Sequence, residues 1–171
     1  MKIQISGFSG SGKSTLAKKL GELYNIPVLH IDTIHFNPNW VVRDNALMDQ
    51  DIEAFLRDNQ DWVIDGNYFR HIPRRYDMAD KIIILKFNRF VCLNRTLKRA
   101  NSHTQRTDMA KGCEDKPSLN FSMWVLFGGR RPKYIKKYHL IEKHFKDKVV
   151  ILRNQKEVDK FVEECKNGIS R

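Results

Sequence analysis

The sequence predicts a three-layer α/β fold in which a five-stranded parallel sheet lies between two layers of helices. Strand and helix patterns alternate along the whole chain, which is typical of parallel sheets. The run Ile82 to Leu85 is apolar throughout and mostly β-branched, as in strands that are buried on both faces. The segment Gly7 to Ser14 joins a strand pattern to a helix pattern and fits G-x-x-x-x-G-K-[ST]. With 171 residues, the chain is expected to form one domain, residues 1–171.

The first strand and the first helix flank this glycine-rich segment. Ile3 and Ile5 alternate with polar residues, which predicts a short strand. Helical spacing then relates the apolar residues Leu16, Ala17, Leu20 and Leu23. The order strand, loop, helix is the context in which this motif has a physical meaning.

The next segment predicts a strand, a loop and a helix. Pro27 to His30 is expected to form the second strand, and the stretch from Thr33 to Asp44 reads as a loop because it contains Asn37-Pro38-Asn39. From about Asn45, a helical stripe is formed by Leu47, Met48, Ile52, Phe55 and Leu56.

Two further strands are expected in the middle of the chain. Trp62 to Ile64 reads as the third strand, and Asp65-Gly66-Asn67 ends it with residues that favour turns. Lys81 to Phe87 reads as the fourth strand. The helix that follows is expected to place Phe90, Leu93 and Leu97 on one face.

The last third of the chain begins with a polar stretch. Residues 101–120 have no clear period and are expected to form a loop. The stretch from Trp124 to Phe145 reads as mostly helical, with interruptions near Gly128-Gly129 and at Pro132. Val149 to Leu152 is expected to be the last strand, and the terminal helix is indicated by Val158, Phe161 and Val162.

Composition favours a cytoplasmic protein without a membrane partner. No apolar run approaches the length of a membrane span, and the N-terminus lacks the apolar core of a signal peptide. The three cysteines contain no C-x-x-C pair, which argues against a disulfide framework or a zinc site. The pattern indicates no particular oligomeric state.

Positive charge is concentrated in the second part of the chain. The net charge is +11, from 31 basic and 20 acidic side chains. Residues 1–65 hold six basic and nine acidic side chains, whereas the remainder holds 25 and 11. Such an excess suits an anionic small molecule, a nucleic-acid backbone or a solvated surface, and charge alone does not choose among them.

The glycine-rich segment predicts a site for a nucleoside triphosphate. Glycines let backbone N–H groups turn inward around phosphates, and the following helix begins with partial positive charge. Lys13 would reach the β- and γ-phosphates, and the Ser14 hydroxyl would face Mg²⁺. The alternative is an ordinary turn that caps a helix. The predicted nucleotide-binding residues are Gly7, Ser9, Gly10, Ser11, Gly12, Lys13, Ser14 and Thr15.

Two aspartates follow predicted strands, where ligands of parallel sheets bind. Asp65 ends the third strand and is our candidate for orienting Mg²⁺; alternatively, it only begins the turn. Asp32 follows the second strand and could accept a proton from a substrate hydroxyl, or simply cap a turn. His30 and His35 lie beside it, but their spacing is weak evidence for a metal, and we do not predict zinc.

Arginines are the candidates for stabilising a migrating phosphoryl group. Arg95 and Arg99 are four residues apart, hence on one helix face, and can converge on one anion. Arg106, and Arg130 or Arg131, could close over the same phosphates; the alternative for all of them is a solvated cationic surface. The predicted catalytic residues are Lys13, Asp32, Arg99 and Arg130. An acceptor would lie near Asp32 and near the cluster Asn67, Tyr68, Arg70, Arg74 and Arg75.

These motifs together resemble the nucleoside-monophosphate-kinase group of P-loop proteins, which has adenylate-kinase-like and shikimate-kinase-like members. The segment from Asp65-Gly66 to Arg70 resembles a segment of adenylate kinases. In that family the Asp acts near Mg²⁺ and the Arg contacts the acceptor phosphate, but this chain has one extra residue before Arg70. The pair Arg95 and Arg99 resembles the arginines at the start of the family's lid. The resemblance also implies that Asn154, after the last strand, borders the adenine.

More narrowly, four segments resemble bacterial DNA topology modulation proteins. They are Leu29 to Asp32, Asp65 to Tyr68, Asn88 to Phe90 and Asp108 to Cys113.

The preferred hypothesis is an ATP- and Mg²⁺-dependent kinase that phosphorylates a nucleoside, a nucleotide or a hydroxy compound. Residues 33–60 would cap this acceptor, and residues 101–121 would close as a lid that excludes water. A second hypothesis is a nucleotide-binding regulator or ATPase that acts on DNA, in keeping with the eight Lys and Arg between residues 130 and 148. No DNA- or RNA-binding motif supports it. A third is a nucleotide sensor without turnover.

Overall fold

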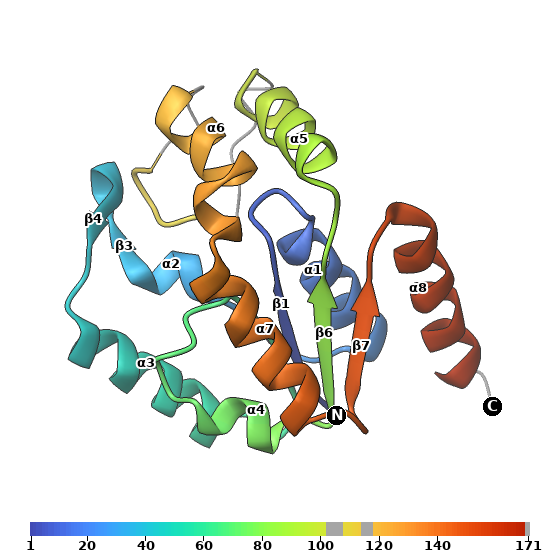
Figure 1. Cartoon of the computed structure of the whole chain (residues 1–171). Helices are drawn as coiled ribbons and strands as arrows, with labels where there is room; N and C mark the ends of the chain where they lie inside the picture. The colour runs from blue at the N-terminus through green and yellow to red at the C-terminus, as the bar shows by residue number, and fades with distance from the viewer. Residues whose placement is uncertain (102–107, 114–117, 170–171) are drawn as a thin grey trace.

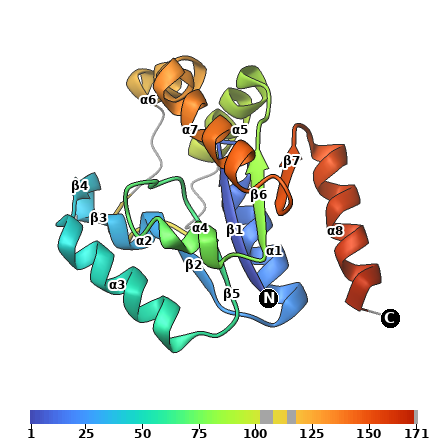
Figure 2. The ribbon, with the colours of Figure 1, turned by 60° about the horizontal axis from the view of Figure 1, so that its bottom comes forward.

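The computed structural model describes residues 1–101, 108–113 and 118–169. Its central sheet has five parallel strands in the order β2-β5-β1-β6-β7 (Figures 1 and 2). These strands are β1 (Lys2–Gly7), β2 (Val28–His30), β5 (Trp62–Asp65), β6 (Lys81–Leu85) and β7 (Val149–Leu152). The predicted fold class and all five predicted strands are therefore confirmed.

Helices cover both faces of the sheet (Figures 1 and 2). One face carries α1 (Lys13–Tyr24) and α8 (Gln155–Ile169), and the other carries α4 (Arg74–Met78) and α7 (Pro132–His144). The remaining helices lie around the carboxyl ends and the β2 edge of the sheet. They are α2 (Ile31–His35), α3 (Asn45–Asp58), α5 (Arg89–Asn101) and α6 (Leu119–Leu126), with the short helices η1 (Pro38–Trp40) and η2 (Gly128–Arg130).

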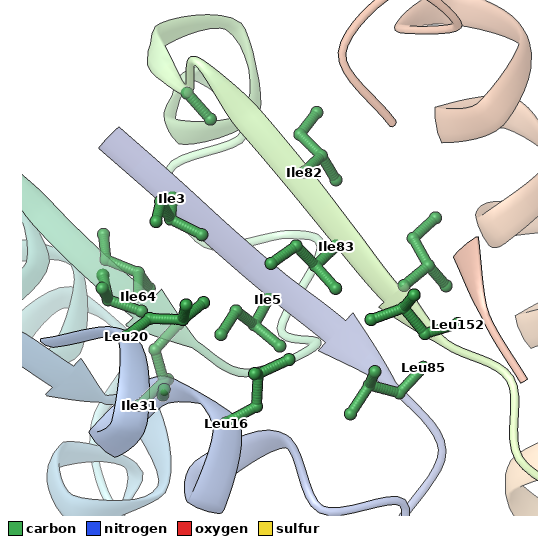
Figure 3. Packing of buried hydrophobic residues seen from close by; sticks show 14 of the residues in the cluster. Ile3, Ile5, Leu16, Leu20, Ile31, Ile64, Ile82, Ile83, Leu85 and Leu152 are labelled. Carbon is green, nitrogen blue, oxygen red and sulfur yellow. The ribbon is translucent and has the colours of Figure 1, made fainter. Parts of the chain in front are cut away.

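Part of the apolar core lies between the sheet and α1, and buried residues of α3, α7 and α8 extend it. Ile3 and Ile5 of β1 point to this side, where they meet Leu16 and Leu20 of α1 (Figure 3). The continuously apolar β6 is buried on both faces, as its sequence predicts. Burying this apolar surface is the main favourable contribution to folding, and it fixes the start of α1 beside the end of β1.

The opposite face of β1 packs against polar side chains. Gln4 and Ser6 are fully buried there. The Arg75 guanidinium of α4 is also fully buried; its Nε donates to Gln4 Oε1 at 2.8 Å and its Nη2 to the Tyr68 carbonyl at 3.1 Å. Arg75, which the sequence places in the acceptor cluster, is therefore part of the structural framework.

The prediction that Thr33 to Asp44 forms a loop is wrong. This segment contains the end of α2, then an antiparallel hairpin of β3 (Phe36–Asn37) and β4 (Val41–Val42) with η1 at its tip. The strands have only two residues each, too few to give an alternating pattern in the sequence. The helix predicted from Asn45 is confirmed as α3, and the Asp44 carboxylate caps it by accepting from the Ala46 and Leu47 N–H groups.

Two other expectations also need correction. In α5 the buried face consists of Cys92, Thr96 and Ala100, while Phe90 and Leu97 are exposed. Helix α6 begins at Leu119, inside the segment expected to be loop and lid; residues 102–107 and 114–117 of that segment lie outside the described part of the chain. Among the described helices, none is long and apolar enough to cross a membrane.

Candidate active site

The loop between β1 and α1 has the backbone conformation that its glycine-rich motif predicts. Gly10 and Gly12 adopt φ angles of +77° and +94°, a region that L side chains rarely occupy. A Cβ on Gly10 would also lie 2.6 Å from the Cys92 carbonyl oxygen, because α5 packs directly against the loop. Only glycine fits at this position, and the loop is held in shape by helix α5.

This loop forms one end of a cavity of about 1530 Å³. Helix α1 begins at Lys13, so its first N–H groups point toward the same space. The loop and α1 residues that line the cavity include Ser9, Gly10, Ser11, Gly12, Lys13, Ser14 and Thr15. Backbone N–H groups at a helix N-terminus together with a lysine make a site suited to phosphate. The side-chain amine of Lys13 donates to the Phe8 carbonyl at 3.3 Å in this structure.

Both predicted arginines of α5 reach this end of the cavity. Arg95 and Arg99 line it from the same helix face. Arg95 Nη1 donates to the Ser11 carbonyl at 3.1 Å, and its Nη2 donates to Gln155 Oε1 at 2.8 Å. Its guanidinium lies 4.6 Å from the centre of the Phe87 ring. Arg95 therefore joins the phosphate loop to α5 and α8, and places positive charge beside the loop.

The opposite end of the cavity contains Asp32 and Tyr68. The Tyr68 hydroxyl donates to Asp32 Oδ1 at 2.5 Å, and both side chains line the cavity. Burial, followed by the negative charge of Asp32, raises the pKa of Tyr68 above its usual range. The phenol therefore stays protonated and acts as the donor. Arg70 also lines the cavity near this end, so these three predicted acceptor residues come together.

Asp65 lies beneath the cavity and is buried. His30 pairs with Asp65 across β2 and β5, and His30 Nδ1 lies 3.1 Å from Asp65 Oδ2. The other oxygen, Oδ1, is buried with no hydrogen-bond partner among the described residues. A carboxylate oxygen left in this state fits an internal water or a cation. Ser14 lines the cavity, whereas Asp65 is not among its described lining residues. The described residues contain no group of three or more His, Cys, Asp or Glu side chains able to hold a metal without other ligands.

Asn67 has a structural role besides the predicted one. Its side-chain amide is hydrogen-bonded to both backbone polar groups of Gly7, and the Tyr138 hydroxyl donates to its Oδ1 at 3.1 Å. Although Asn67 lines the cavity, its amide is used to fix the start of the phosphate loop. The amide thus has a structural role in addition to the predicted one, and a substrate contact through Asn67 stays a prediction.

Five predicted site residues are not among the described residues that line the cavity: Gly7, Asp65, Arg74, Arg130 and Asn154. Arg74 forms an ion pair with Glu53 at the surface. Asn154 caps α8, since its Oδ1 accepts from the Glu157 N–H at 3.0 Å; the neighbouring Gln155 lines the cavity instead.

Arg130 was predicted to be catalytic, but its guanidinium is used to hold two segments together. It lies 3.8 Å above the Phe8 ring, and its Nη2 donates to the Phe87 carbonyl at 2.9 Å and its Nε to the Val125 carbonyl at 3.2 Å. Desolvation by burial lowers its pKa. Arg106, the other arginine proposed for closure, lies outside the described residues.

Trp124 of α6 and Tyr138 of α7, which the sequence analysis did not propose as site residues, also line the cavity. Trp124 Nε1 donates to Ser9 Oγ at 3.3 Å, and the Trp124 ring packs edge-on against Tyr134 with centroids 5.4 Å apart. Tyr138 contacts Phe8 and Phe69. Their spacing is that of ordinary core residues, so the sequence carries no signal that they face a site.

The comparisons with known proteins concern the fold. No family model matches the chain, and no curated protein matches its sequence. Shikimate kinase from Bacteroides thetaiotaomicron is 15% identical and has a TM-score of 0.56, with 100% of this chain and 99% of that chain covered. The chain has the fold of P-loop kinases. A gluconokinase from Sinorhizobium meliloti 1021 is 16% identical with a TM-score of 0.54, covering 99% of this chain and 91% of the other.

These similarities support the broader resemblance, to P-loop kinases, that the motifs suggest. They do not extend to the narrower resemblance to DNA topology modulation proteins, which stays a prediction.

Proposed function

We propose that the protein is an ATP-dependent kinase that transfers a phosphoryl group to a hydroxyl group of a small polar acceptor. The observation that carries the proposal is that one cavity joins the phosphate loop with Lys13, Arg95 and Arg99 at one end to Asp32 at the other. A phosphoryl transfer enzyme needs both ends in one enclosed space, since its catalysis consists mainly of positioning and charge neutralisation.

At the phosphate end, the chain supplies fixed positive charge. The N–H groups of the loop and of the first turn of α1 would bind the β- and γ-phosphates, with the Lys13 amine moving from the Phe8 carbonyl to the phosphate oxygens. Arg95 and Arg99 would stabilise the charge that the γ-phosphoryl group carries during transfer. Because hydrogen bonds to Ser11 and Gln155 already hold the Arg95 guanidinium beside the loop, it would need little movement to contact the phosphates.

At the acceptor end, Asp32 would hold the hydroxyl that attacks. Tyr68 donates to Oδ1, and Oδ2 takes no hydrogen bond from a described residue, which leaves it to accept from the acceptor. As the acceptor oxygen forms its bond to the γ-phosphorus, the bond from that phosphorus to the β–γ bridging oxygen breaks. The hydroxyl proton passes to Asp32, and ADP keeps the electron pair of the broken bond.

Ser14 and Asp65 are the residues that would hold Mg²⁺ with the nucleotide, Asp65 through the buried oxygen that lacks a partner. When bound, the ion neutralises charge on the β- and γ-phosphates.

The test is a screen for ADP release with nucleosides, nucleotides and hydroxy acids as acceptors. Lys13→Ala should abolish transfer without unfolding the protein, and Asp32→Asn should lower kcat by about 10²-fold or more. Asp58→Asn, at an exposed position on α3, is the matched control and should behave as the wild type. Full turnover in Lys13→Ala would refute the proposal.

A second candidate, a nucleotide-binding protein that acts on DNA, is favoured by the lysines of α7. Lys133, Lys136, Lys137 and Lys143 all lie on this helix. DNA binding through phosphate contacts should weaken steeply between 50 and 200 mM salt. If binding is absent at 50 mM salt, this candidate is refuted.

A further inference from the structure

Aromatic rings form a continuous wall from Asp32 to the tip of the hairpin. Tyr68, which donates to Asp32, lies 4.4 Å from His35, measured between ring centres. His35 lies 4.5 Å from Phe36, and Phe36 lies 5.2 Å from Trp40. All four rings line the cavity. They come from α2, from the hairpin and from the turn after β5, so the wall is formed only in the folded chain.

The Phe36 and Trp40 rings meet nearly at a right angle, with an interplanar angle of 76°. A flat ring that lies against the face of one of them therefore presents its edge to the other. Stacked and edge-to-face contacts of this kind are the preferred geometries of aromatic rings.

Trp40 is held in a strained position. Its φ angle is +61°, and that of Asn39 is +62°; for a bulky residue this conformation is an outlier that costs free energy. The contacts that maintain it come from the segment 108–113. The Asn39 N–H donates to the Gly112 carbonyl at 3.1 Å, and the Trp40 N–H to Cys113 Sγ at 3.4 Å. Trp40 is 42% exposed and lines the cavity.

Most arginines near this end are bound elsewhere. Arg43 pairs with Asp51, Arg74 pairs with Glu53, and Arg75 is buried against Gln4. Among the described residues, the Arg and Lys side chains that line the cavity from outside α1 and α5 are Arg70 and Lys137, and the Lys137 amine lies 5.3 Å from the centre of the Phe69 ring. Ring faces, more than cations, therefore define the shape and chemistry of this end of the cavity.

On the basis of the kinase function proposed above, we propose that the acceptor is a planar aromatic or heteroaromatic compound with a hydroxyl group. Its ring packs against Trp40 and Phe36, and its hydroxyl reaches Asp32. The transfer then gives a phosphate monoester of the ring compound and ADP. Hydroxy acids with a saturated skeleton lack the flat surface that this wall contacts.

Loss of one stacking partner costs about 1–3 kcal/mol in comparable ring-binding sites, which converts to a rise in Kd of about fivefold to 150-fold. Trp40→Ala should show this rise, and Trp40→Phe should restore binding to within about threefold of the wild type. Val42→Ala is the matched control, since Val42 lies in the same hairpin and is 60% exposed but is not among the described lining residues.

The experiment is calorimetry on the full chain with Mg²⁺ and a non-hydrolysable ATP analogue filling the donor site. The probes are uridine beside ribose, and benzyl alcohol beside cyclohexylmethanol, with gluconate as the saturated acid. We expect at least one ring compound to bind tenfold or more tightly than its saturated partner, and this binding to depend on Trp40. Thermal melting of each variant shows whether it is folded.

Three results would overturn the inference: equal binding of the saturated partners, an unchanged Kd in folded Trp40→Ala, or no binding of either ring compound. Different results would refute the kinase function proposed above. If a ring compound binds but no phosphoryl group moves from ATP to it or to any acceptor in the screen, kinase activity is refuted and the ring site remains. If gluconate is phosphorylated and Trp40→Ala leaves its KM unchanged, kinase activity remains and the ring site is refuted.

Discussion

The side-chain amide of Asn67 is hydrogen-bonded to both backbone polar groups of Gly7. Asn67 Oδ1 accepts from the Gly7 N–H at 2.9 Å, and its Nδ2 donates to the Gly7 carbonyl at 2.8 Å. The turn after β5 thereby fixes the point at which β1 enters the phosphate loop. The Tyr138 hydroxyl adds α7 to the same junction.

Asn67→Ala should therefore lower the free energy of unfolding by about 1–3 kcal/mol, because two partly buried hydrogen bonds are lost and the Gly7 N–H is left without a partner. Urea unfolding measures this change. Asn59→Ala is the control, since Asn59 makes one side-chain hydrogen bond, to Phe55 at the end of α3. An equal or smaller loss in Asn67→Ala would contradict a structural role for the amide.

Alanine at Gly10 and alanine at Gly12 should have unequal effects. Both positions have positive φ angles, so each substitution costs about 1–2 kcal/mol of backbone strain. At Gly10 the new Cβ would also meet the Cys92 carbonyl, whereas at Gly12 the nearest atom is the flexible end of Arg95, 3.3 Å away. Thermal melting should rank Gly10→Ala well below Gly12→Ala, and the reverse order would mean that α5 does not pack on the loop as described.

Arg130→Lys should affect stability more than catalysis. Lysine keeps the charge but cannot donate in the same plane to the Phe87 and Val125 carbonyls, so a loss of about 1–3 kcal/mol is expected. At a temperature where the variant is folded, its kcat with the acceptor that the wild type phosphorylates should stay within a few-fold of the wild-type value. A hundredfold fall in kcat with unchanged stability would restore the catalytic role predicted from the sequence.

Stability should decrease as the pH falls through the range in which His35 titrates. Burial lowers the pKa of His35 below its ordinary value of 6.5; the charge of Asp32 opposes this effect and that of His71 adds to it. The unfolded chain therefore binds the proton more readily, so protonation favours unfolding below about pH 6.5. Comparing urea unfolding at pH 7.5 and 5.5 tests this, and His35→Gln should show a smaller decrease than the wild type. An identical decrease would assign the effect to other groups.

The central strands β1, β5 and β6 were predictable because they are buried. Runs such as Ile82 to Leu85 have to be apolar on both faces, and this requirement is visible in the sequence without any knowledge of their partners. The phosphate loop was predictable because its glycines satisfy local backbone requirements. The hairpin at Phe36 to Val42 was missed because two-residue strands leave no pattern, and part of its support comes from Gly112 and Cys113, far along the chain.

The roles of single polar residues were harder to predict, since they depend on distant partners. Asn67 and Gly7 are 60 residues apart, and Arg130 and Phe87 are 43 apart. A sequence shows that an amide or a guanidinium is near a site but not which atoms occupy it. Asp32, Tyr68 and Arg70 could be placed together because they all follow the carboxyl ends of neighbouring strands.

The most direct test of the account is calorimetric titration of the protein with MgATP, for the wild type and for Lys13→Ala. Lys160→Ala, on the surface of α8, is the matched control. We predict measurable heat with one site per chain for the wild type and for Lys160→Ala, and affinity at least tenfold weaker in a folded Lys13→Ala. The absence of heat for the wild type, or equal affinity in Lys13→Ala, would contradict the central claim that this loop binds the phosphates of a nucleotide.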